Sequence, residues 1–221
     1  PKVEEPLTVK RANSNLIQQL IKSWLTMNVF EYFIITNFGI LLINLIISAI
    51  LWIHDKTTYY RSLFFVWLMC IFSYLIQGLF TQNDFSIALG FSSAFLINVS
   101  LSHLLSRITG VQLPWKLFVS ILIIGYALAT FSFLLQFNFT LMALPIVIAV
   151  SFPAIHASCK VLFTKWGTIS ISLKGLSITI FILALHNIDF AFLRNVESFA
   201  PIGFIIALFI VFCLSIFTPA V

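Results

Sequence analysis

Seven long apolar runs constrain this chain more than any other feature of its sequence. A helix that crosses the hydrocarbon of a bilayer needs about 20 mostly apolar residues, because each backbone amide must find its hydrogen-bond partner inside the segment. The sequence therefore predicts an all-α, polytopic membrane helix bundle of about seven transmembrane helices. The predicted helices are Phe33–Ile53, Ser62–Phe80, Phe85–Leu104, Trp115–Leu135, Thr140–Ala157, Ile169–Leu185 and Phe199–Phe217.

Composition predicts the same class of protein. Of the 221 residues, 61% are hydrophobic and 9% are charged, whereas soluble domains average roughly 45–50% apolar and roughly 25% charged residues. The net charge of +5 comes from bases in loops between apolar runs, so membrane topology explains it and nucleic acid is not an expected partner. Cys70, Cys159 and Cys213 show no metal-binding spacing, and no cofactor is predicted.

The bases are distributed unequally between the connections of the predicted helices. By the positive-inside rule, connections rich in lysine and arginine lie in the cytoplasm. This places the N-terminus outside and the C-terminus in the cytoplasm. The connections after the first, third and fifth helices, with the start of the sixth helix, hold Lys56, Arg61, Arg107, Lys116, Lys160, Lys165 and Lys174, whereas Arg194 is the only base in the alternate connections.

Residues 1–30 form a polar tail ahead of the first apolar run. Within it, apolar residues from Leu16 to Leu25 recur at helical spacing, which predicts an amphipathic helix in the membrane interface. The bases of the tail would lie outside in this topology, but an interfacial helix can lie on either face of a membrane. The seven-helix domain then covers residues 31–221, and a cytoplasmic output domain is expected beyond residue 221.

Two prolines, Pro145 and Pro153, lie within the predicted helix Thr140–Ala157. Proline removes one helix hydrogen bond, and its ring clashes with the preceding turn. The fifth helix is therefore predicted to be kinked or locally unwound.

Polar residues inside the apolar runs allow two interpretations. Asn37 and Asn44 are seven residues apart and share a helix face, while Gly90 and Asn98 belong to a stripe of small residues that lets another helix approach closely. Such residues commonly join neighbouring helices by hydrogen bonds. If the stripes converge, they instead line a binding pocket. The candidate lining residues are Asn37, Asn44, Gln77, Asn98, Phe190 and Phe192.

Three histidines, His54, His103 and His156, fall at one predicted face of the membrane, and Asp55 is next to the first. Three histidines and a carboxylate can bind a catalytic zinc ion. However, the sequence holds no HxxxH or HExxH pair among them, and the helix dipole alone favours histidine at a helix C-terminus. The histidines are kept as candidate ligands, but no metal site is predicted.

The last connection concentrates ionisable groups in a chain that has few of them. His186, Asp189, Arg194 and Glu197 alternate with phenylalanines between the sixth and seventh runs. Charged groups near a membrane are costly without partners and are functional candidates by default, and histidine changes charge near physiological pH. The four residues are predicted to form a network that binds a signal or holds a resting packing. The alternative is a structural cap on the turn, and no catalytic residue is predicted.

The segment "LHNIDFAFLR", followed by "ESFAPIGF", resembles the pattern LHxLDYPFLRPVxWFAPWGF. That pattern belongs to the last extracellular loop and final helix of multi-pass sensor modules in bacterial signalling proteins, chiefly sensor histidine kinases. The resemblance implies an input domain in the inner membrane that detects a small-molecule or lipid signal. It would pass a helix rearrangement through the last helix to a dimeric cytoplasmic kinase. The matching positions are Leu185, His186, Asp189, Phe190, Phe192, Leu193, Arg194, Phe199, Ala200, Pro201, Gly203 and Phe204.

Two other functions remain open from the residues. A small transporter fits a chain with a proline-broken helix, because transporter sites often use interrupted helices near the bilayer midplane. Against a transporter, no internal repeat is found and the ionisable residues gather at the outer rim. An intramembrane enzyme would use the histidines at the inner face.

Overall fold

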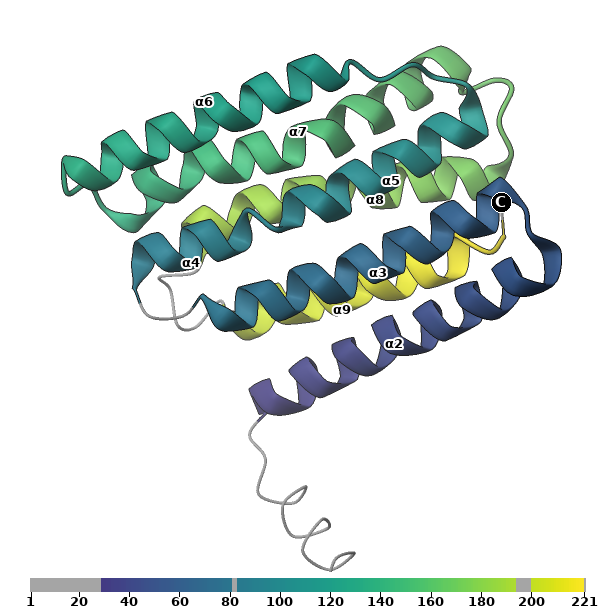
Figure 1. Cartoon of the computed structure of the whole chain (residues 1–221), viewed down its shortest axis with the longest axis horizontal. Coiled ribbons are helices and arrows are strands. Elements are labelled where there is room, and N and C mark those ends of the chain that lie inside the picture. The colour runs from purple at the N-terminus through teal and green to yellow at the C-terminus, as the bar shows by residue number, and fades with distance from the viewer. Residues whose placement is uncertain (1–28, 81–82, 194–199, 221) are drawn as a thin grey trace, which may run out of the picture. The chain divides into compact units, whose positions relative to one another are not determined.

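The computed structural model describes residues 29–80, 83–193 and 200–220 (Figure 1). The chain divides after Thr36 into two units. The first unit contributes only the start of one helix, and the arrangement below is that of residues 37–221. Residues 1–28, which include most of the predicted tail, lie outside the described part, as do Arg194 and Glu197.

The described residues form eight helices and no strand, which confirms the all-α prediction. Six stretches are long and apolar enough to cross a bilayer, and α4 and α5 together make one of them. The shorter apolar helix α9 has 18 residues, or about 27 Å, close to the roughly 30 Å of a bilayer's hydrocarbon. The helices are α2 (Val29–Asp55), α3 (Thr58–Leu79), α4 (Asp84–Phe91), α5 (Ala94–Thr109), α6 (Trp115–Leu134), α7 (Phe139–Lys165), α8 (Ile171–Leu193) and α9 (Ala200–Phe217).

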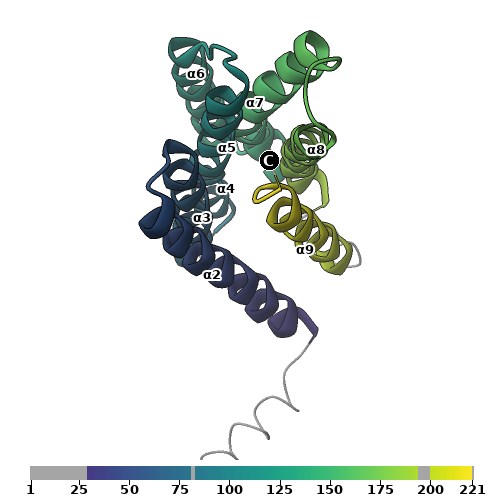
Figure 2. The ribbon, with the colours of Figure 1, turned by 90° about the vertical axis from the view of Figure 1, so that its right-hand side faces the viewer.

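Helix α7 is the central element among residues 37–221. It packs against α4, α5, α6 and α8, while α5 lies between α3 and α7, and α9 packs on α8 (Figure 2). Its side chains Val150, Ala154 and Val161 have no exposed surface. Helix α7 therefore fixes the positions of its neighbours.

Large apolar side chains cover the outside of the helices. Ile43, Ile46 and Ile50 on α2 are more than half exposed, as are Ile123 and Ile124 on α6. Soluble monomers rarely expose apolar surface of this extent. These faces suit the hydrocarbon of a bilayer, and the chain has the architecture of a multi-pass membrane protein.

A short turn at Ser92 and Ser93 divides the third span into α4 and α5. This break in the regular helix is small, because both residues keep right-handed helical φ and ψ angles. The Tyr126 hydroxyl on α6 donates to Ser92 Oγ, and Ser93 Oγ lies 2.8 Å from Ser73 Oγ on α3. These contacts from two neighbouring helices stabilise the break, because they satisfy polar groups that lipid would leave without partners.

Helix α7 remains helical through Pro145 and Pro153, so the unwinding predicted there does not occur. Close packing explains the difference. A Cβ atom on Gly125 of α6 would lie 2.7 Å from Ala149 Cβ and 2.8 Å from the Pro145 carbonyl oxygen. Helix α6 thus lies directly against the α7 backbone in the turn that follows the first proline.

Candidate functional site

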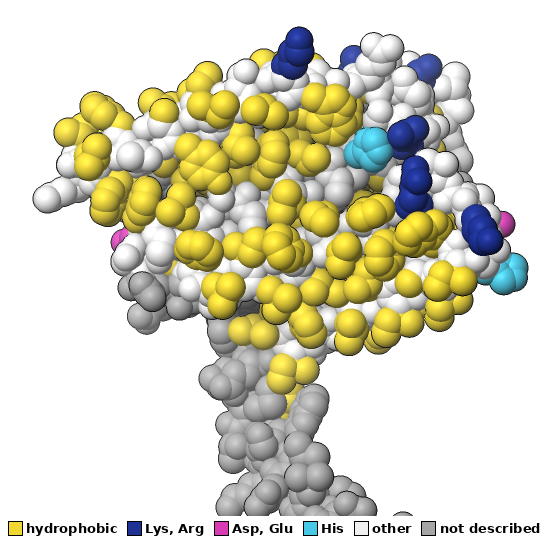
Figure 3. Space-filling view, viewed as in Figure 1, with side chains coloured by type: hydrophobic (Ala, Val, Ile, Leu, Met, Phe, Trp, Pro, Cys, Tyr) yellow, Lys and Arg dark blue, Asp and Glu magenta, His cyan; other side chains and the backbone are white. Residues whose placement is uncertain are grey.

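The bases of the described residues gather toward one end of the helices, the right-hand end in Figure 3. This basic end combines the end of α2, the starts of α3, α6 and α8, and the ends of α5 and α7, with Asp55 as an acid among the bases. Asp84 and Asp189 lie at the opposite end, on α4 and α8. The basic end contains Lys56, Arg61, Arg107, Lys116, Lys160, Lys165 and Lys174.

The C-terminal end of α9 is joined to other helices at the basic end. Asn44 Nδ2 on α2 donates a hydrogen bond of 2.8 Å to Ser215 Oγ. The Tyr59 hydroxyl at the start of α3 donates to the carbonyl oxygen of Thr218. Thr218 follows α9 directly and is 1% exposed. Polar contacts from two helices therefore fix the point where α9 ends.

A third contact to the end of α9 comes from α8. The Phe217 ring lies so close to α8 that a Cβ atom on Gly175 would be 2.5 Å from ring carbon Cε1. Glycine is the residue that allows this approach, since any side chain would meet the ring. One turn earlier on α9, Leu214 is 2% exposed within the core. The end of α9 thus contacts α2, α3 and α8, and we call these contacts the α9 end contacts.

Sequence reasoning singled out Asn44 but missed the other polar members of the α9 end contacts. Ser215 could have been identified from the sequence, because it is the only hydroxyl-bearing residue in α9. No feature of the sequence distinguishes Tyr59 and Thr218 from other residues at helix ends. Their pairing joins the start of one helix to the end of another, 159 residues away in sequence.

At the opposite end, α8 continues to Leu193 and does not stop near Leu185 as predicted. His186 and Asp189 therefore lie on a helix, not in a loop. His186 Nδ1 lies 3.0 Å from Asp189 Oδ2, and their side chains are 16% and 38% exposed. A Cβ atom on Gly203 of α9 would lie 4.0 Å from His186 Cε1. The other two predicted network members lie outside the described residues, and the four-residue network remains a prediction.

Packing explains why α8 extends so far. Phe190 stacks on Phe91 of α4 with ring centroids 4.1 Å apart and planes 8° apart. It also meets Phe139 of α7 edge-on at 5.9 Å, and Ala191 beside it has no exposed surface. These aromatic contacts bury one face of the last turns of α8 and keep them helical. Phe192, the other aromatic pocket candidate, is 52% exposed.

The four amides predicted as pocket lining have different partners. Gln77 Nε2 donates to Ser73 Oγ at 3.1 Å, Asn44 bonds to α9, and Asn98 Nδ2 donates to its own helix backbone. Within the described ranges, the buried Oδ1 atoms of Asn37 and Asn98 have no hydrogen-bond partner. The contact of Asn44 with Ser215 fits the packing interpretation, whereas Gln77 bonds within α3. A pocket lined by all four amides remains a prediction.

The three histidines of the basic end have separate surroundings. His54 is exposed at the end of α2, His103 Nε2 accepts a 3.4 Å hydrogen bond from Arg107 Nε, and the His156 ring lies 5.7 Å from the Phe118 ring. In the part of the chain that the structure describes, no three His, Cys, Asp or Glu side chains gather to hold a metal ion. The histidines therefore do not form the zinc site considered from the sequence.

Comparison with known proteins gives no family for this chain. No protein-family model matches it, and neither a curated protein nor a solved structure matches it significantly. Its function is therefore inferred from its own geometry and sequence pattern.

Proposed function

We propose that this chain is the membrane-embedded input domain of a bacterial signal-transduction receptor, with its N-terminus outside and its C-terminus in the cytoplasm. The α9 end contacts carry the proposal, because two helices from the start of the chain, α2 and α3, meet α8 where α9 ends. In a receptor of this kind α9 would continue into a dimeric histidine kinase. The bases at the same end support a cytoplasmic location for it.

The same helix also runs beside the predicted signal network. His186 lies next to Gly203 near the start of α9, and Ser215 and Thr218 are held near its end. A small-molecule or lipid signal that binds one packing of the helices more tightly shifts the population toward that packing. The α9 end contacts differ between the two packings, so the shift reaches the kinase as a displacement or rotation of α9.

A fusion experiment tests this proposal. A continuous helix is built from the end of α9, after Phe217, into the phospho-acceptor helix and ATP-binding domain of a histidine kinase, with junctions that differ by single residues over one helical turn. Autophosphorylation in reconstituted vesicles is expected to rise and fall with the junction, because rotation of α9 sets the orientation of the kinase helices. Asn44→Leu is expected to change this activity about five-fold, since interhelical hydrogen bonds in membranes contribute on the order of 1 kcal/mol.

Two further variants make the fusion experiment specific. Ser215→Ala should reproduce the effect of Asn44→Leu, and the double variant should add little, because both remove one bond. Ser120→Ala is the matched control, since Ser120 bonds its own helix backbone as Ser215 does but is exposed on α6. If autophosphorylation is the same for all junctions and is unchanged by Asn44→Leu, the proposal is contradicted.

A small transporter is the second candidate, and one observation favours it. The third span has a turn at Ser92 and Ser93, although both residues keep helical backbone angles, and helices that are fully discontinuous often form transporter sites. The discriminating measurement is labelling of Ser93→Cys by a membrane-impermeant reagent, in a variant without the native cysteines. Reaction from both sides of the membrane indicates alternating access and a transporter. Reaction from neither side, as expected from the 7% exposure of Ser93, counts against a transporter site at this turn.

A further inference from the structure

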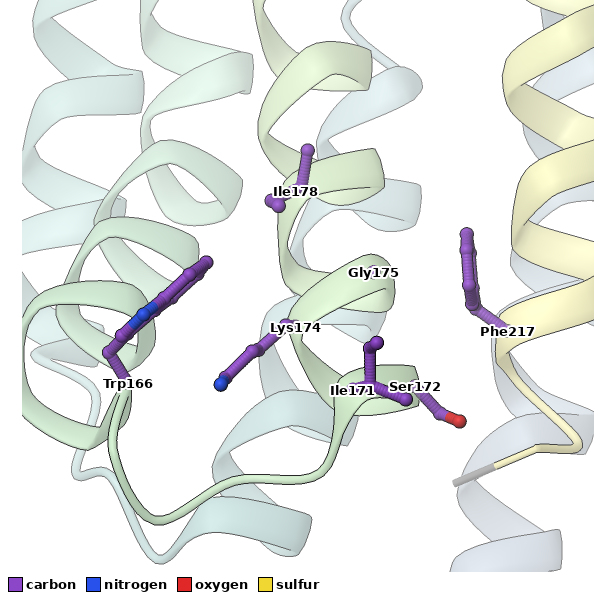
Figure 4. Close-up of a pocket in the computed structure, with 7 residues that line it drawn as sticks. All are labelled: Trp166, Ile171, Ser172, Lys174, Gly175, Ile178 and Phe217. Atoms are coloured by element: carbon purple, nitrogen blue, oxygen red, sulfur yellow. The ribbon is translucent and has the colours of Figure 1, made fainter.

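A groove of about 710 Å³ lies where α8 begins, at the basic end. The turn after α7 forms one side of it, the first turns of α8 form its floor, and Phe217 at the end of α9 stands on the far side (Figure 4). Pockets for drug-sized ligands are about 300–1,000 Å³. The groove is thus much larger than a single inorganic ion requires.

One cation, Lys174, lies in this groove. Its Nζ atom is 4.7 Å from the centroid of the Trp166 ring, and Figure 4 shows the side chain directed toward that ring. Within the described residues, no carboxylate lies in ion-pair distance of Lys174. Lys174 is also in the first turn of α8, where the helix dipole is positive. The aromatic ring positions the ammonium group, which keeps its capacity to bind an anion.

The rest of the groove is mostly apolar. Ile171 is 85% exposed and Ile178, about two turns further along α8, is 39% exposed. The Phe217 ring adds an aromatic surface on the α9 side. A soluble anion would gain nothing from these side chains, whereas an amphiphile would cover them. The occupant that fits has a negative head at Lys174 and a hydrocarbon chain along α8.

The geometry points to a binding site for an anionic phospholipid in this groove, with the lipid phosphate at Lys174 and an acyl chain that runs along α8 past Ile178. Basic pockets at the end of transmembrane helices bind acidic head groups in this way. Indole rings such as Trp166 favour the same interfacial depth. The site does not depend on the sensor proposal, because lipid binding is measured without any output domain.

Other bases at the same end are less suited to this role. Lys160 Nζ already donates to the Gln112 carbonyl oxygen at 3.1 Å. Lys116 is exposed at the start of α6 but does not line the groove. Lys116 therefore provides a matched control with the same charge, at the same end of the bundle.

Native mass spectrometry of the whole chain, titrated with phosphatidylglycerol or with phosphatidylcholine, tests the site. Lys174→Met is expected to weaken phosphatidylglycerol binding roughly five-fold, the effect of one lysine near an anionic lipid. Phosphatidylcholine binding should not change, and Lys116→Met should have little effect on either lipid. Equal losses from the two lysine variants would show general surface attraction and overturn the site, as would no loss from Lys174→Met.

A second pair of variants tests the apolar part of the groove without changing charge. Ile178→Trp fills the groove and is expected to reduce phosphatidylglycerol binding, whereas Ile182→Trp, one turn further along α8 and outside the groove, should not. Inorganic phosphate is added as a competitor to wild-type protein. Displacement of the lipid by phosphate alone at equimolar amounts, or equal effects of the two tryptophan variants, would contradict a lipid site.

Discussion

At the basic end of the bundle, polar side chains join different helices, whereas at the opposite end the described ion pair lies within one helix. Asn44 and Ser215 connect α2 to α9, but His186 and Asp189 are three residues apart on α8. A bond between helices breaks or shifts when the helices move. A bond within one helix moves with it unchanged. The Asn44–Ser215 bond therefore responds to movement of α9 against α2, as the bonds of Ser92 and Ser93 respond to movement of α6 and α3. The histidine and aspartate need a partner outside α8 to do so.

The largest expected effect concerns the orientation of the two ends. Single cysteines replace Gln112 at the basic end and Phe137 at the opposite end, both exposed, in a variant without native cysteines. In intact cells, a membrane-impermeant maleimide is expected to label only Phe137→Cys, and Gln112→Cys should react only after permeabilisation. The reverse pattern would place the basic end outside and would remove the basis for a cytoplasmic kinase there.

Alanine at one glycine near each end compares the packing of the ends. At Gly90, the new Cβ would lie 2.6 Å from Phe80 Cβ, an atom fixed to the backbone. We expect a loss of about 1–3 kcal/mol in the free energy of unfolding, measured by thermal unfolding in detergent. At Gly175 the new Cβ meets the tip of the Phe217 ring, which can rotate, so the loss should be smaller.

Gly78→Ala is the control for both glycine variants, because a Cβ there has nothing within 4 Å. It should leave stability unchanged or raise it by up to about 1 kcal/mol, since alanine favours the helix. If all three variants behave alike, close helix approach does not hold either end.

A double-mutant cycle measures the bond between helices at the basic end. Asn44→Leu and Ser215→Ala each remove one partner of the 2.8 Å hydrogen bond. The coupling energy in detergent unfolding is expected to be about 0.6–1.7 kcal/mol, the range for interhelical hydrogen bonds in membrane proteins. Additive effects of the two changes would mean that the bond contributes nothing to holding α9.

The smallest expected effect is at the opposite end. Asp189→Asn should lower the free energy of unfolding by about 0.5 kcal/mol or less, because the pair is local to α8 and the carboxylate is partly exposed. The same unfolding assay checks this value. A loss as large as that of the Asn44 variant would show that Asp189 has a second partner and that the two ends are equally coupled.

Local periodicity predicted helices but not their interruptions. Proline at 145 and 153 predicted a kink or local unwinding in the fifth span. Helix α7 is not unwound there, whereas the third span has a turn at Ser92 and Ser93. A proline removes one local bond, and α6 packs closely against α7 at Gly125 in the turn that follows. Serine hydroxyls make a break stable only where other helices supply partners. Whether such partners are present depends on the tertiary packing, so local sequence patterns do not predict this turn.

The end of α8 also could not be predicted from the local sequence alone. Ionisable residues after Leu185 predicted a loop, but Phe190 packs on Phe91 and the helix continues to Leu193. The sequence predicted a network in which Asp189 pairs with Arg194 and His186 with Glu197, and those pairings remain predictions. The contact between His186 and Asp189 at 3.0 Å was not predicted, because it needs a helix that places residues three apart on one face. Their position on a helix was missed because the aromatic partner lies on α4, 99 positions earlier in the chain.

The sequence by itself determined that this chain is a bundle of membrane-type helices, because apolar runs of this length satisfy their amides in lipid only as helices. It also located some of them closely, as with the run Trp115–Leu135 and helix α6, Trp115–Leu134. The ends of α7 and α8 were missed, because these helices continue to Lys165 and Leu193 and not to Ala157 and Leu185. Only the tertiary structure decided which polar groups meet, such as Asn44 and Ser215, which are 171 residues apart. Helical periodicity assigns a residue to a face of its own helix, but the packing of the other helices decides what that face contacts.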